Sequence, residues 1–199
     1  MCDLQKIFEK RRSVYKLNNN IPISEYELEK CIKEAIKHVP SAFNSQSSRV
    51  VLLIGDKNIV FWKDIVLKSL QKIVPENKFE YTKQRILSFS EGYGTVLFFE
   101  DMDIIENLEN KFPEYRDNFI IWANQTSAML QYMIWTLFTD KNIGASLQHY
   151  NPLIDDKIKQ FFNIDKSWKL IAQMPFGCVA KTPENKEFSS VDDRLKVFK

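Results

Sequence analysis

The sequence predicts a three-layer α/β or α+β domain, in which helices flank a central sheet. Two observations favour this class. Short apolar runs that are typical of buried strands alternate with helical segments, and the first such run comes only after two helices. The chain has 199 residues, of which 44% are hydrophobic, so one sizeable core can form. Neither an internal repeat nor a linker interrupts it, and we expect residues 1–199 to form a single domain.

Two helices are expected before the first strand. The first begins near Leu4, where apolar residues recur at helical spacing, and ends near Ser13. The second begins at a capping box, in which Ser24 and Glu27 can each satisfy a backbone N–H group of the other. Its apolar positions keep helical spacing as far as Pro40, where the helix is expected to have ended.

Strands and helices then alternate towards the C-terminus. Short apolar runs next to glycine, proline or asparagine indicate strands, and longer periodic segments indicate helices. The expected strands cover residues 50–54, 95–99, 145–150 and 168–180, the last with a break at Pro175. The expected helices cover residues 58–74, 80–90, 117–142 and 152–162. The polar tail from Thr182 to Lys199 is expected to be extended and to pack on a surface, one option being a partner subunit.

Composition and charge argue against several classes of function. The 28 basic and 26 acidic residues give a net charge of +2, which provides no electrostatic footprint for nucleic acid. Three widely spaced cysteines and two histidines argue against a disulfide framework, a zinc site or a multi-histidine metal site. We therefore expect a reduced, cytoplasmic protein without a metal ion or a nucleic-acid partner.

The long apolar stretch from Phe119 to Phe138 is expected to be buried rather than to span a membrane. It contains asparagine, glutamine, threonine and serine side chains, which are costly to place in lipid. A helix that is apolar on nearly all sides is more often buried in a core or an oligomer interface. The charged N-terminal segment also lacks the apolar region of a signal peptide, so we expect no membrane partner.

Two polar segments are candidates for ligand binding. Arg11-Arg12-Ser13 offers guanidinium groups, whose planar forks match phosphate oxygens two at a time. Residues 40–46 add serine, asparagine and glutamine, which could bind the edge of a heterocycle. Together they suggest a phosphorylated ligand that carries a ring. Each also has a purely structural interpretation: the arginines could form a solvated helix end, and the second segment could be a polar loop.

Five segments share one order with a known family and span nearly the whole chain: Arg11 to Tyr15, Pro40 to Arg49, Gly92 to Asp101, Gly144 to Tyr150 and Asp192 to Leu195. In this combination the sequence resembles the FMN-dependent nitroreductase family. Within the family it is similar to the fatty-acid-repression branch, which contains the fungal Frm2/Hbn1-like and bacterial nitroreductases.

The resemblance implies which residues hold the FMN phosphate. In the family, an N-terminal Arg-x-Ser element binds the phosphate and the ribityl chain, and this role carries over to Arg11, Arg12 and Ser13. A late basic residue near the phosphate corresponds to Arg194.

The resemblance also implies which residues lie near the flavin ring. The Pro-Ser-x-x-Asn-Ser-Gln loop of the family reaches flavin that is bound mainly by the partner subunit, which implicates Ser41, Asn44 and Gln46. The turn beside the flavin N5 and O4 atoms corresponds to three consecutive residues, Leu147, Gln148 and His149.

Two positions depart from the family pattern. Many relatives carry a basic residue where this chain has Tyr15. Many also carry Gln-Pro-Trp where this chain has Gln46-Ser47-Ser48, so the packing at that loop must differ. Both departures fit the Frm2-like branch.

The architecture implied by the resemblance is α+β, with a central mixed sheet flanked by helices. It also implies a homodimer with two FMN sites at the interface and a C-terminal tail that embraces the other subunit. Hydride would pass from NADH or NADPH through FMN to a small-molecule acceptor, such as a nitroaromatic or a quinone, by a ping-pong mechanism. Because the flavin carries the chemistry, no catalytic protein residue is expected.

Two other classes of function stay open from the sequence. The chain could bind FMN as a redox or lipid-responsive regulator with little turnover. It could also be a flavin-free interaction module, which would be colourless when folded.

Overall fold

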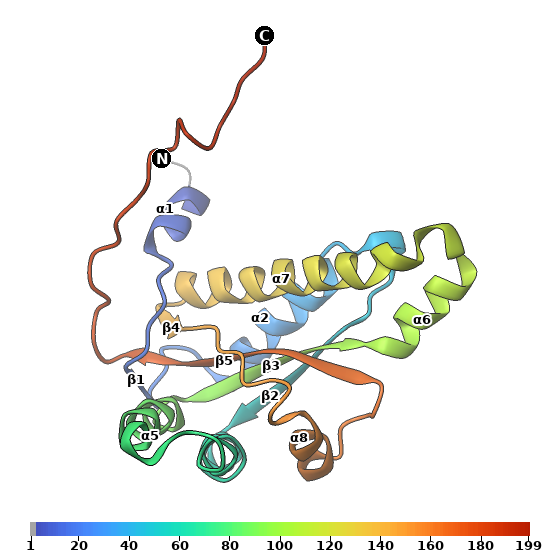
Figure 1. The fold of residues 1–199 in the computed structure, drawn as a ribbon. Helices are drawn as coiled ribbons and strands as arrows, with labels where there is room; N and C mark the ends of the chain where they lie inside the picture. Colours follow the sequence, from blue (N-terminus) through green and yellow to red (C-terminus); the bar gives the residue numbers. More distant parts are fainter. Residues whose placement is uncertain (1–2) are drawn as a thin grey trace.

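The computed structural model describes residues 3–199 and places a sheet between two layers of helices (Figure 1). The strands are β1 (Leu17–Asn18), β2 (Ser48–Ile54), β3 (Gly94–Asp101), β4 (Ile143–Ala145) and β5 (Trp168–Val179). Their order is β1-β5-β3-β2, and β4 also pairs with β5. The expected three-layer α+β architecture is confirmed.

The sheet is antiparallel rather than mixed, which corrects the expectation. All pairings between its five strands run antiparallel. The cause is visible between β2 and β3, where Ile54 at the end of one strand pairs with Gly94 at the start of the next. The helices between β2 and β3 therefore bring the chain back to the end of the sheet at which β2 finished. Among residues 3–199, parallel pairing is confined to an isolated bridge between Ser13 and Ala145.

Helices cover both faces of the sheet (Figure 1). One face carries α2 (Glu25–His38) and α7 (Arg116–Asp140). The other face carries a continuous helical segment made of α3 (Asp56–Val60), the π-helical η2 (Phe61–Leu67) and α4 (Lys68–Leu70), together with α5 (Glu76–Ser90) and α8 (Asp155–Phe162). Shorter elements complete the chain: α1 (Asp3–Lys10), η1 (Ala42–Asn44), α6 (Met102–Lys111) and η3 (Pro113–Tyr115).

The two faces of the sheet bury separate cores because side chains alternate along each strand. On β3, Val96 and Phe98 pack with α2 and α7, whereas Leu97 and Phe99 pack with the helices of the other face. β3 is buried along its whole length, as expected of a central strand covered on both sides. The polar segments described below adjoin this sheet: residues 41–46 precede β2, residues 147–149 follow β4, and the tail follows β5.

Local sequence signals account for most element boundaries. The capping box at α2 is confirmed: Glu27 N donates to Ser24 Oγ at 3.2 Å, and Ser24 N donates to Glu27 Oε2 at 3.0 Å. The helix α6 was not predicted, because its sequence is largely polar and only Ile105 on it is buried. Its start is marked by Asp101, whose carboxylate accepts from Asp103 N at 3.2 Å.

Two strand predictions need correction. β5 is continuous through Pro175, which stays in register with Thr95. Proline lacks only the N–H, and its carbonyl still accepts from Ser146 N at 3.3 Å, so the strand does not break. β4 covers residues 143–145 rather than 145–150, because Asn142 takes a left-handed conformation (φ 60°) that ends α7 early and starts the strand.

The helix α7 is the longest element, with 25 residues, and it contains the stretch that was expected to be buried. None of the helices in the described part of the chain is long and apolar enough to cross a membrane. The C-terminal tail leaves β5 and runs along the molecule past α1 (Figure 1). Its residues from 184 onwards are exposed, including the large apolar Phe188 and Phe198.

Candidate functional site

The N-terminal segment after α1 lies against the strand that follows α7. Ser13 forms a bridge with Ala145, and Val14 N donates to the Ala145 carbonyl at 2.9 Å. These bonds place Arg11, Arg12 and Ser13 next to the segment that leads from β4 into the Gln148 turn. Two motifs that are more than 130 positions apart in the sequence thus meet in the fold.

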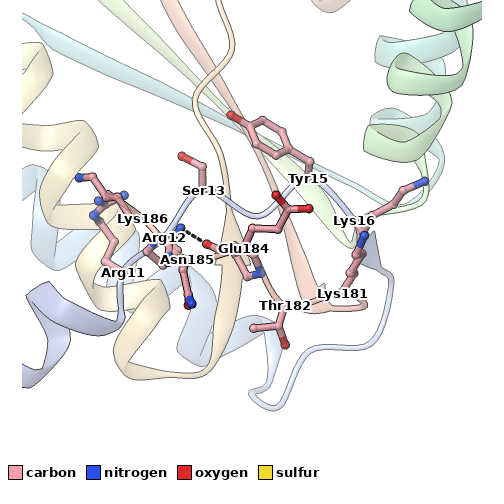
Figure 2. A pocket seen from close by; sticks show the side chains of 11 residues that line it. Arg11, Arg12, Ser13, Tyr15, Lys16, Lys181, Thr182, Glu184, Asn185 and Lys186 are labelled. Atoms are coloured by element: carbon pink, nitrogen blue, oxygen red, sulfur yellow. Dashed lines mark hydrogen bonds between the residues drawn. The ribbon is translucent and has the colours of Figure 1, made fainter. Parts of the chain in front are cut away.

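A cationic pocket of about 530 Å³ opens between this segment and the start of the tail. Figure 2 shows the Arg11, Arg12 and Lys186 side chains gathered on one side, with Tyr15, Lys16 and Lys181 on the other. Glu184 is the only carboxylate among the described residues that line it. A pocket with five basic side chains and one acidic side chain favours an anionic ligand.

The two arginines of the pocket are held by different contacts. The Arg11 guanidinium lies 4.4 Å from the centre of the Trp135 ring. Arg12 Nη2 donates to the Glu184 carbonyl, which ties the start of the tail to the N-terminal segment (Figure 2). Stacking on an aromatic ring orients a guanidinium without using its N–H donors, so Arg11 can still bind phosphate oxygens.

A second pocket, of about 430 Å³, adjoins the first because Tyr15 and Lys16 line both. Its other wall is the helix α5, which contributes Arg85 and Ser88. Arg85 Nη2 lies 3.5 Å from Gln148 Oε1, so this arginine connects α5 to the turn after β4. Sequence reasoning missed Arg85 because a single basic residue on an amphipathic helix resembles any solvated position.

Internal hydrogen bonds fix the turn at residues 147–149. Gln148 and Gln173 exchange backbone bonds of 2.7 and 2.9 Å, and Gln148 Nε2 donates to Ser146 Oγ at 3.1 Å. Gln148 is only 5% exposed, whereas Leu147 is half-buried and His149 is exposed. The turn is therefore rigid at Gln148 and presents His149 to solvent.

The loop at Ser41 to Gln46 lies elsewhere along the same face of the sheet. Its neighbours are Trp122, Gln125 and Met129 on α7, whereas Arg11 stacks on Trp135. Gln125 and Trp135 are ten positions apart, which corresponds to a rise of about 15 Å along a helix. The structure thus brings the Arg11 and Gln148 segments together within one chain but does not bring Ser41, Asn44 or Gln46 to them.

Arg194 also lies outside both pockets. It is exposed in the tail, where its backbone N–H donates to the Val191 carbonyl at 2.9 Å, and it lines neither cavity. Of the basic residues that line the cationic pocket, Lys181 and Lys186 were not singled out from the sequence. They enter the pocket because β5 ends beside Lys16, where Ala180 N donates to the Lys16 carbonyl.

Comparison with known proteins shows the family. The nitroreductase family model matches residues 8–178. The chain belongs to the nitroreductase family. HBN1 of Saccharomyces cerevisiae is 31% identical over 189 residues, which cover 94% of this chain and 93% of HBN1, and the resemblance to the Hbn1-like branch is confirmed.

Solved nitroreductases share the fold. The nitroreductase CinD from Lactococcus lactis in complex with nicotinic acid is 37% identical, with a TM-score of 0.92 over 99% of this chain and all of CinD. A nitroreductase with bound FMN from Desulfitobacterium hafniense has a TM-score of 0.74 at 16% identity, over 100% of both chains, which shows a common fold.

In this nitroreductase-family chain, a buried carboxylate anchors the Ser41 to Gln46 loop. Glu100, at the end of β3, is 1% exposed and accepts from Ser47 Oγ at 2.6 Å and from Ser48 Oγ at 2.5 Å. Ser47 and Ser48 are the two residues that depart from the family's Pro-Trp. The hydroxyl groups therefore give the base of the loop a hydrogen-bonded anchor in place of an aromatic one.

The loop itself is conformationally strained. Phe43, Asn44 and Gln46 all have positive φ angles, between 49° and 55°, which non-glycine residues seldom adopt. Gln46 N donates to Ser41 Oγ at 3.0 Å, and the Gln46 carbonyl accepts from Arg49 Nη1 at 2.8 Å. These bonds and the Glu100 anchor hold Asn44 and Gln46 exposed on the surface.

We expect Glu100 to make folding stability depend on pH. Burial, the largest influence, raises the pKa of Glu100 above its ordinary value of 4.5, against the opposing effect of the serine hydroxyls. The folded state therefore favours the neutral acid, so the contribution of Glu100 to the free energy of unfolding should fall as the pH rises from about 4.5 through the raised pKa. Chemical denaturation of the wild type and Glu100→Gln across this range measures the effect.

The Glu100→Gln variant should lack this fall in stability, whereas the exposed control Glu106→Gln should keep it. Parallel pH profiles for the wild type and Glu100→Gln would contradict the assignment.

Proposed function

We propose that this chain is a homodimeric, cytoplasmic FMN-dependent oxidoreductase. Bound FMN would supply hydride transfer, from NADH or NADPH to a nitroaromatic, quinone or similar acceptor, in a ping-pong cycle. The observation that carries the proposal is the pair of adjoining pockets, one cationic and one lined by Tyr15 and Arg85, with the Gln148 side chain in contact with Arg85. Cys31 and Cys178 are free thiols, which is consistent with a reducing compartment.

The residues present fit FMN at its phosphate end. Arg11, Arg12 and Ser13 supply guanidinium and hydroxyl donors at one side of the cationic pocket. A phosphate carries up to two negative charges, so two arginines can neutralise it and pair with its oxygens. Arg194 would add a further donor when the tail packs on a second subunit.

The ring end of FMN fits the second pocket. Tyr15 offers a flat aromatic face, and Arg85 offers N–H donors beside it. The turn of Leu147, Gln148 and His149 lies next to this pocket, because Gln148 Oε1 accepts from Arg85 Nη2 at 3.5 Å. Backbone hydrogen bonds join Gln148 to Gln173, so the position of this turn is fixed.

A second subunit would complete the site along α7. The segment from Asn118 to Thr139 contains no charged residue, yet Ile121, Met129 and Tyr132 are 41–51% exposed. An uncharged, partly apolar helix face is typical of a subunit interface rather than of a solvated surface. The half-buried Ser41 and the exposed Asn44 and Gln46 belong to the loop that lies at this same helix, so dimerisation would bring them to the partner's flavin. In a site shared between subunits, the loop at residues 41–46 is expected to lie apart from the Arg11 and Gln148 segments of its own chain.

Acceptor choice is expected to depend on His149. Its exposed position on the turn beside the ring end lets it contact an acceptor without holding FMN. Replacing it with alanine should change the ratio of kcat/KM for a nitroaromatic to that for a quinone by about threefold or more, since one hydrogen bond contributes about 0.5–1.5 kcal/mol. FMN content should stay unchanged.

Steady-state kinetics with several acceptors check this expectation, with His38→Ala on α2 as the matched control. His38 is exposed and pairs with Glu34 at 3.3 Å, outside both pockets. Unaltered relative kinetics for every acceptor in His149→Ala would count against the role.

The first test of this function is the visible spectrum of the purified protein. Its visible spectrum should be that of a flavoprotein, and the cofactor released on denaturation should have the mass of FMN. A colourless, folded protein that FMN cannot reconstitute would contradict the proposal and favour an interaction module.

A further inference from the structure

Glu100 is a buried carboxyl group that the electron transfer proposed above does not use. It is 1% exposed and lies near the end of β3, where Ser47 and Ser48 donate to it. A carboxyl group is costly to bury, and apolar side chains of similar volume often stabilise a core equally well. Stability alone therefore does not account for an acid at this position, and the geometry of its contacts offers another role.

The two oxygens of Glu100 bind two consecutive residues. Ser47 Oγ donates to Oε2 at 2.6 Å, and Ser48 Oγ donates to Oε1 at 2.5 Å. Consecutive side chains of an extended chain normally point to opposite faces. Hydrogen bonds from both hydroxyl groups to the same carboxyl group therefore fix the backbone at the point where the loop at residues 41–46 enters β2.

Asp101, the next residue of β3, holds the backbone beside these serines. Its N–H donates to the Ser47 carbonyl at 2.9 Å, and its Oδ2 accepts from Arg49 Nη2 at 3.0 Å. Arg49 Nη1 in turn donates to the Gln46 carbonyl at 2.8 Å. Gln46 has a positive φ angle of 49°, which persists only where the surroundings impose it. The end of β3 thus fixes the backbone of Gln46.

The side-chain amides that this anchor presents are left without partners. Asn44 and Gln46 are exposed, and within residues 3–199 neither uses its side chain in a hydrogen bond. An amide offers two donors and one carbonyl acceptor, which can match the polar edge of a heterocycle. Unpaired amides held in an uncommon backbone conformation are typical of a site that a ligand completes.

Resting on the proposed function, we propose that Glu100 is a positioning residue for the flavin of the partner subunit. The loop at residues 41–46 lies along α7, away from the phosphate site of its own chain, so the flavin ring that it reaches is the partner's. Glu100 itself touches no ligand. It acts through the two serine hydroxyl groups, which hold the backbone that orients Asn44 and Gln46. The buried acid of one subunit thereby sets the flavin affinity of the other.

Glu100→Ala removes both anchors and should weaken FMN binding about tenfold, because two neutral hydrogen bonds from the loop to the ring would be lost. Riboflavin binding should weaken by the same factor, since the loop reaches the ring and not the phosphate. Glu100→Gln should recover most of the affinity, because its amide can accept from one serine and donate to the other. Glu106→Ala, which changes an exposed acid on α6, is the control.

The double variant Ser47→Ala/Ser48→Ala removes the same anchor from the loop side. It should show the same loss for FMN and for riboflavin, and it replaces Glu100→Ala in every comparison if that variant does not fold. Flavin fluorescence titration of the apoprotein measures the affinities. Circular dichroism and the melting temperature verify that each variant is folded.

Mixed dimers test whether Glu100 acts across the subunit interface. One subunit carries Arg11→Ala, the other carries Glu100→Ala, and two different affinity tags isolate the mixed dimer. If the loop serves the partner's site, one site of this dimer has both defects and the other has neither. The mixed dimer should therefore bind one FMN with wild-type affinity, whereas the homodimer of either variant should bind FMN weakly at both sites.

Three results would overturn the inference. The first is wild-type affinity for both flavins in Glu100→Ala or in the double serine variant. The second is a mixed dimer in which both sites bind weakly, which would confine the effect of Glu100 to its own chain. The third is a wild type that binds no FMN, which would overturn the proposed function as well. The first two leave FMN binding and turnover standing, so the failures are distinguishable.

Discussion

Replacing Arg11 with alanine is expected to weaken FMN binding by about tenfold or more. A charge-assisted hydrogen bond contributes about 1.5–3 kcal/mol, and 1.4 kcal/mol corresponds to a factor of ten in affinity. Arg11 is oriented by the Trp135 ring at 4.4 Å, so its N–H donors are already directed before a ligand arrives. A flavin fluorescence titration of the apoprotein measures the change in the dissociation constant.

Riboflavin, which lacks the phosphate, separates this role from a general effect on the site. Arg11→Ala should lower the affinity for FMN but leave that for riboflavin nearly unchanged. Arg116→Ala is the matched control, because Arg116 lies at the start of α7 and its Nη2 atom lies 3.3 Å from Asn110 Oδ1, outside both pockets. Wild-type FMN affinity in Arg11→Ala, or an equal loss for both ligands, would remove Arg11 from the phosphate site.

A charge on the exposed face of α7 should separate the subunits. Ile121 is 51% exposed on the uncharged face of that helix. Ile121→Asp would bury a carboxylate without a partner in each half of the interface, at a cost of roughly 3 kcal/mol or more each, which weakens the dimer more than a hundredfold. FMN affinity should fall together with the affinity between the subunits, because the partner would supply Ser41, Asn44 and Gln46 to the site.

Sedimentation velocity and FMN titration on the same samples measure both effects. Ile73→Asp is the matched control, because Ile73 is 63% exposed but follows α4 on the opposite side of the sheet. A monomeric wild type, or an Ile121→Asp variant that is monomeric with unchanged FMN affinity, would contradict a site shared between subunits.

Local chemistry in the sequence predicted much of the fold. The capping box of α2 needs only Ser24 and Glu27, three residues apart, so it could be recognised without tertiary information. The continuity of β5 through Pro175 could not, because it depends on the neighbouring strand and on Ser146. The polar helix α6 was missed for a similar reason, since it buries so little apolar surface.

Candidate site residues could be named from the sequence where a motif contains them. They could not be named where only the fold brings them together. The resemblance implied that the Arg11 to Ser13 segment and the Gln148 turn bind one cofactor, but the bridge between Ser13 and Ala145 that brings them together could be seen only in the fold. Arg85 belongs to no motif and enters the pocket only because α5 packs beside the Tyr15 segment. The positions of Ser41, Asn44 and Gln46, apart from the other site residues, are consistent with a partner subunit and do not by themselves test it.

We propose, above all, that the chain uses FMN to carry electrons from a nicotinamide to an acceptor. The most direct measurement is an anaerobic titration of the FMN-loaded protein with NADH and with NADPH, followed by a nitroaromatic or a quinone. We expect one equivalent of at least one nicotinamide to bleach the visible flavin absorbance and the acceptor to restore it. Flavin that stays oxidised with both nicotinamides would contradict this electron transfer and favour a regulatory flavin-binding protein.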